Sequence, residues 1–110
     1  TDLSPPEEFL QGCARKISKS VQVPAHKHIG IVRETTITQE SWIIHKGSVR
    51  VAYYDIDDSF LLETDLHEGD CAILYRGGHS LEVLEDNTIF YEFKTGPYFG
   101  VDADKENLNV

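Results

Sequence analysis

The stretch "SVRVAYYD", Ser48 to Asp55, decides the fold class of this chain. Its apolar residues alternate, so that Val49, Val51 and Tyr53 lie on one face of an extended segment. A period of two residues is typical of a strand with one face buried against a core. The stretch therefore predicts a half-buried β-strand.

The following segments repeat this pattern. "FLLETDL", "CAILYR", "HSLEVLE" and "TIFYEFK" are strand-like, and turn signals such as "DIDDS", "HEGD", "RGG" and "EDN" separate them. About eight short strands joined by tight turns predict an all-β chain, a small antiparallel β-barrel. "SPPEEFLQGCARK" predicts a short N-terminal helix, because Ser4 can cap it and the prolines suit its first turn.

The 110 residues fit one domain. We expect a helical segment at residues 1–20, a barrel at residues 21–95 and a tail at residues 96–110 that packs along the outside. Ten Lys and Arg residues stand against 19 Asp and Glu residues, a net charge of -9, which argues against nucleic acid or an anionic membrane as partner.

The apolar runs are too short to span a bilayer and no signal peptide is visible, so a cytoplasmic location is expected. The two cysteines form no CxxC motif and are expected to be reduced. Cys71 alternates with Ile73 in a strand-like run, which predicts a buried thiol.

Histidines suggest a site. In "PAHKH", Pro24 to His28, the imidazoles of His26 and His28 would project from the same face of a strand, which suits two ligands of one metal. His79 follows "RGG" and opens a strand, and an imidazole on an apolar face needs a partner. The alternatives are a surface pair for His26 and His28, and a core histidine bonded to a backbone carbonyl for His79.

These residues lie in segments that resemble the motifs of the cupin family: "HKH", then "ESWIIHKG" beginning at Glu40, then "GDCAILYRGGH" ending at His79. The spacing differs from the family pattern in that eleven residues separate His28 from Glu40. The run "GGHSLEVLED…FYEFKTGPYFGVDADKENL" also resembles small cupins associated with sugar-nucleotide and surface-polysaccharide pathways.

The resemblance implies a jelly-roll barrel with a divalent metal ion in its mouth, commonly iron, manganese, zinc or nickel. Its ligands would be His26, His28, Glu40 and His79, with Glu34 as the rival of Glu40. Three imidazoles and one carboxylate suit a divalent first-row metal.

Two classes of function stay open at this point. One is a metal-dependent enzyme that acts on a small polar substrate, with sugar derivatives among the candidates, by isomerisation, epimerisation or dioxygenation, and with its catalytic residues unassigned. The other is a non-catalytic module that binds a small ligand. Trp42, Tyr53, Tyr91 and Arg50 are candidates for the substrate pocket, although the aromatic residues also suit a core and Arg50 a surface ion pair. A homodimer formed through a sheet edge or face is expected.

Overall fold

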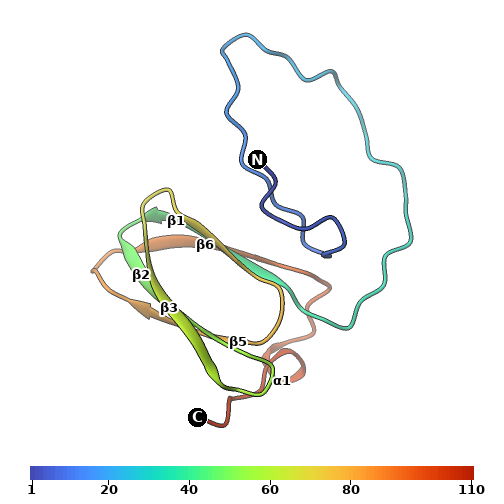
Figure 1. Cartoon of the computed structure of the whole chain (residues 1–110). Coiled ribbons are helices and arrows are strands. Elements are labelled where there is room, and N and C mark those ends of the chain that lie inside the picture. The colour runs from blue at the N-terminus through green and yellow to red at the C-terminus, as the bar shows by residue number, and fades with distance from the viewer.

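The computed structural model describes all residues from Thr1 to Val110 and is almost entirely β-structure. The elements in chain order are β1 (Glu40–Lys46), β2 (Ser48–Tyr54), β3 (Phe60–His67), β4 (Cys71–Leu74), β5 (Gly78–Val83), β6 (Ile89–Lys94) and the one-turn helix α1 (Val101–Asp104). They form two antiparallel three-stranded sheets, in the orders β4-β1-β6 and β3-β2-β5 (Figure 1). The predicted all-β class is confirmed, but there are six strands rather than eight and they do not close into a barrel.

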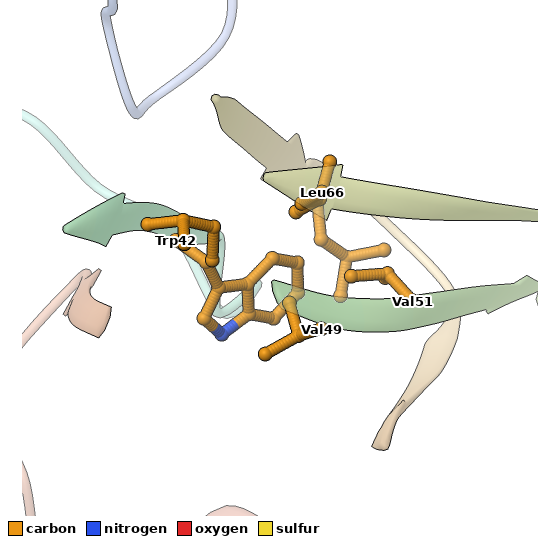
Figure 2. Close-up of a cluster of buried hydrophobic side chains, with 6 residues drawn as sticks. Trp42, Val49, Val51 and Leu66 are labelled. Atoms are coloured by element: carbon orange, nitrogen blue, oxygen red, sulfur yellow. The ribbon is translucent and has the colours of Figure 1, made fainter. Parts of the chain in front are cut away.

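The core lies where the inward faces of β1 and β2 meet. Trp42 and Ile44 of β1 pack with Val49 and Val51 of β2, and Leu66 joins them from β3. Figure 2 shows the indole of Trp42 directed at the two valines and Leu66. The alternation predicted from "SVRVAYYD" is therefore correct, because both valines are fully buried.

The predicted N-terminal helix is wrong. Ser4 does not cap a helix: its hydroxyl donates to the Leu10 carbonyl and accepts from the Gly12 amide, each at 2.9 Å, which closes a compact turn. The physical reason lies in the two prolines, because the residue before a proline is disfavoured in helical geometry. Ser4 and Pro5 both precede a proline, so the helix cannot begin where the cap was expected.

Residues 15–38, called the arm below, contain no strand, although the barrel was expected to begin at residue 21. Figure 1 shows the arm as a long blue-to-cyan loop that stands away from both sheets. It raises the radius of gyration to 16.3 Å, against about 13 Å for a compact chain of this length.

Two further features concern cysteine and helix content. Both cysteines are free, as expected, but Cys71 is exposed rather than buried, because its side chain lies on the outward face of β4. None of the helical structure is long and apolar enough to cross a membrane.

Candidate functional site

A glutamate and a histidine meet at one end of the space between the sheets. Glu40 is the first residue of β1 and His79 is the second residue of β5, so they come from different sheets. The Oε2 atom of Glu40 lies 3.4 Å from Nε2 of His79. Both side chains line a cavity of about 610 Å³.

The "RGG" turn sets the position of His79. Gly77 has φ +85°, and a methyl group at this residue would overlap the carbonyl oxygen of Tyr54. Only glycine combines that backbone conformation with so close an approach to a neighbouring strand. β5 therefore starts hard against the end of β2, where His79 is paired with Tyr53.

Trp42 supports the pair from the core side. Its ring centroid lies 4.8 Å from that of His79, with an angle of 51° between the planes. Its indole N–H donates to Oε1 of Glu92, on β6, at 3.1 Å. The fully buried indole thus packs against the imidazole of His79 and is hydrogen-bonded to the carboxylate of Glu92.

Burial opposes charge on both partners. It is the main cause that raises the pKa of Glu40, to which Glu92 adds, while Lys94 and Lys105 act against it. Burial also lowers the pKa of His79, and of the nearby charges Glu92 opposes this shift whereas Lys105 and Lys94 reinforce it.

The 3.4 Å contact is longer than a charge-assisted hydrogen bond, which is typically about 2.7–2.9 Å. Together with the two pKa shifts, this favours a neutral imidazole beside a carboxyl group of raised basicity. A fixed ion pair, in contrast, would raise the pKa of the histidine and lower that of the glutamate.

The cavity is polar and acidic. Its lining includes six carboxylates but only one lysine, Lys105; the carboxylates are Glu40, Asp55, Asp58, Glu92, Asp104 and Glu106. This charge disfavours an anionic ligand and suits an uncharged polar or cationic one.

The C-terminal tail forms part of the cavity wall, which corrects the expectation that it packs along the outside. Residues 104–108 all line the cavity. A methyl group at Gly78 would approach the side chain of Leu108 to within 2.7 Å, so the tail lies directly on the start of β5. The amide of Asn109 donates to Oδ2 of Asp58 at 3.0 Å and fastens the end of the tail.

The structure brings together two of the four predicted metal ligands. Glu40 and His79 meet, whereas His26 and His28 lie on the arm with exposed side chains, as does Glu34. The rings of His26 and His28 are 5.6 Å apart at their centroids. No group of three or more His, Cys, Asp or Glu side chains could hold a metal ion in this arrangement, so the donor set does not fit a metal centre here. The ligand assignment stays a prediction.

The other pocket candidates lie in different places. Tyr53 is half-buried beside His79 in the sheet, and burial raises its pKa. Tyr91 is exposed on the outward face of β6. Arg50 also faces outward and donates to both carboxylate oxygens of Asp65, at 2.8 and 3.2 Å. Tyr53 thus lies next to the site, and Tyr91 and Arg50 do not line the cavity.

Sequence reasoning missed Glu92 and Lys94. In "IFYEFK" one face carries Tyr91 and Phe93 and the other carries the two charged residues, and Tyr91 was predicted to line the pocket or the core, which places the charged face outward. The register gives the opposite result, because Glu92 is the partner of the buried Trp42. The local sequence holds no signal for this, because the inward direction of Glu92 depends on the pairing of β6 with β1.

No family model, curated protein or solved structure matches this chain.

Proposed function

We propose that this chain is a small cupin-like enzyme that isomerises or epimerises a small, uncharged, polar carbonyl compound such as a sugar derivative. The observation that carries this proposal is the pair of buried Glu40 and half-buried His79 in the wall of the 610 Å³ acidic cavity. Two facing antiparallel sheets with the pair at one end support the cupin-like part. The position of both residues in the segments that resemble cupin motifs supports it further.

The pair has the properties that proton transfer next to a carbonyl group requires. The Glu40 carboxylate, whose pKa burial raises, takes the proton from the carbon beside the carbonyl. Neutral His79 donates a hydrogen bond to the carbonyl oxygen, where negative charge develops. Return of the proton from Glu40 to the carbonyl carbon, while the hydroxyl proton of the neighbouring carbon moves to the carbonyl oxygen, gives isomerisation. Protonation of the original carbon by solvent from its opposite face, while Glu40 releases the proton that it took to solvent, gives epimerisation.

The divalent metal implied by the resemblance has no step in this proposal. Two of its predicted ligands lie on the arm, away from Glu40 and His79, and dioxygenation would require all four to converge. Iron, manganese, zinc or nickel binding remains a separate prediction.

The second candidate is a non-catalytic binding module. The tail in the cavity wall favours it, because a wall segment fastened through Asn109 and Leu108 can help to retain a small ligand without any reaction.

The decisive experiment combines ligand binding with proton exchange. Trp42 is the only tryptophan in the chain and touches His79, so its emission reports on the cavity. Neutral aldoses and ketoses are titrated against this emission, and those that bind are incubated with the protein in D2O and followed by proton NMR. We expect Glu40→Gln to retain binding and to slow exchange of the substrate proton by about 100-fold or more.

Matched controls separate the pair from general effects of substitution. Glu68→Gln and His45→Gln alter the same residue types at exposed positions outside the cavity and should leave exchange unchanged. Exchange at the wild-type rate in Glu40→Gln would refute the enzyme. Ligand binding without exchange in the wild type would establish the binding module instead.

A further inference from the structure

The arm is a protruding loop with both ends anchored. At its start, the Ala14 amide donates to the Thr1 carbonyl at 2.8 Å. At its end, the Gln39 side chain donates to Oε2 of Glu8 and accepts from the Leu10 amide, each at 2.6 Å. The loop therefore leaves the body and returns to it near the N-terminal turn, and its middle projects outward (Figure 1).

Between these ends, the backbone of the arm is almost unpaired. Residues 15–38 make a single backbone–backbone hydrogen bond, from Val21 N to the Ser18 carbonyl at 3.3 Å. Segments of this length without secondary structure are uncommon within a compact domain and are either functional loops, such as binding loops, or linkers and disordered segments. The arm thus offers many free amides and carbonyls to a partner.

Apolar side chains on the arm are also exposed to solvent. Ile29 and Val32 are 84% and 86% exposed, and Val21, Val23 and Ile31 are exposed as well. Val21 and Val23, like Ile29 and Ile31, are two residues apart and lie on one face if the segment is extended. β-branched residues in this pattern favour a strand that packs one face against a partner.

The same chain carries an unoccupied strand edge. β3 pairs only with β2, so one side of its eight-residue backbone is free. Leu62 shares the face of buried Leu66 but is 50% exposed, and Phe60, which pairs with Tyr54 beyond a register shift, is 58% exposed. A long edge with uncovered apolar side chains readily accepts another strand.

Charge complementarity connects the two features. The arm carries five Lys and Arg residues and one carboxylate, Glu34. Residues 55–70, which comprise β3 and its flanking turns, carry seven carboxylates and neither Lys nor Arg. Opposite charges on two surfaces steer their encounter and fix their register.

From these observations, we infer that the arm of one copy of this chain adds as a strand to β3 of a second copy, and that the contact is reciprocal. Donor and acceptor are on the same chain, so two contacts close a twofold dimer. A second copy is the fitting partner because its acidic edge matches the basic arm, and because the arm projects from its own body rather than lying on it. This inference does not depend on the chemistry of the cavity.

The test measures the dimer dissociation constant by sedimentation velocity over about 1–100 μM chain. We expect the wild type to dimerise, more weakly as NaCl is raised, because exposed charges are screened. Ile29→Ser with Ile31→Ser on the arm, and separately Leu62→Ser on β3, should each raise the dissociation constant about tenfold or more. Val101→Ser with Val110→Ser is the control, since both valines are exposed outside the arm and β3.

Every variant is checked for folding by the emission of buried Trp42, which none of the substitutions touches. Amide hydrogen exchange should show the arm protected in the dimer and unprotected after dilution. A wild type that stays monomeric over the whole range would overturn the inference, as would an arm protected in a monomer. If either serine variant dimerises with the dissociation constant of the wild type, the inference is also overturned, because the contact between the copies then lies elsewhere.

Discussion

Two glycines with nearly the same backbone conformation differ in what surrounds them, and this difference predicts how the turn before His79 responds to substitution. Gly77 has φ +85° and Gly69 has φ +86°. A methyl group at Gly69 meets nothing within 4 Å, whereas one at Gly77 overlaps the carbonyl oxygen of Tyr54. Alanine substitution at the two positions therefore imposes the same conformational strain but only one steric overlap.

The magnitude follows from these two contributions. An alanine in the left-handed region costs about 1–2 kcal/mol, offset by about 0.4–1 kcal/mol from the lower entropy of the unfolded chain. We expect Gly69→Ala to lower the free energy of unfolding by about 1 kcal/mol. Gly77→Ala adds an overpacking cost of about 1–3 kcal/mol, because backbone atoms of β2 must move.

The assay is urea unfolding followed by the emission of Trp42, the single and fully buried tryptophan. At about 1–2 kcal/mol per M, the midpoint of Gly77→Ala should lie about 0.5–3 M below that of Gly69→Ala. The rate of substrate proton exchange should also fall in Gly77→Ala but not in Gly69→Ala, because only the first substitution strains the backbone within two residues of His79. Equal losses of stability in both variants would refute the close approach of the turn to Tyr54.

Three other outcomes are expected. Burial raises the pKa of Glu40 above its ordinary value of 4.5. The free energy of unfolding of the wild type, relative to that of Glu40→Gln, is therefore greatest below pH 4.5 and declines as the pH rises through the pKa of the folded state. A difference in unfolding free energy between the two proteins that stays the same at all pH values would contradict this. Because the arm lies outside the cavity, the double variant His26→Ala with His28→Ala should exchange the substrate proton at the wild-type rate. If this variant instead loses both proton exchange and bound metal, measured by elemental analysis, the four predicted ligands converge after all. Leu108→Ala removes the contact with Gly78 and should weaken ligand binding about fivefold and increase acrylamide quenching of Trp42; unchanged quenching would show that the tail does not cover the cavity.

The all-β class was predictable because it depends on a local period of two. Val49 and Val51 are buried and Arg50 faces outward, as the alternation requires. The wrong predictions concern features that local patterns do not determine. The segment around Ser4 has the composition of a helix start, yet its hydroxyl closes a turn with Leu10.

Half of the candidate site was predictable. Glu40 and His79 could be named because each opens a strand beside a turn and each has a motif position. Glu92 could not, since its inward direction depends on the pairing of β6 with β1 across fifty residues of chain. The position of the arm was equally hidden, because "HKH" in an extended segment is compatible with a strand in the sheet and with a loop outside it.

The inward-facing residues of β1, β2, β5 and β6 change from apolar to polar toward the same end of the two sheets. This change explains how a chain with so small a core can also carry a polar cavity. Along β1 and β6 the paired inward residues are Ile44 with Phe90, then Trp42 with Glu92, then Glu40 with Lys94.

Along β2 and β5 the same direction runs from Val49 with Val83, through Val51 with Leu81, to Tyr53 with His79. Most of the six-residue core cluster therefore lies away from the polar end, and Leu74, the partner of Glu40, is its member beside the cavity. Charged side chains, which would destabilise a core if they were buried without partners, occupy the other end. There they line a cavity, in which water or a ligand can pair with them. Apolar residues in place of Glu40 and His79 would give a more stable pair of sheets, but the protein would then lack the pair that we propose transfers a proton.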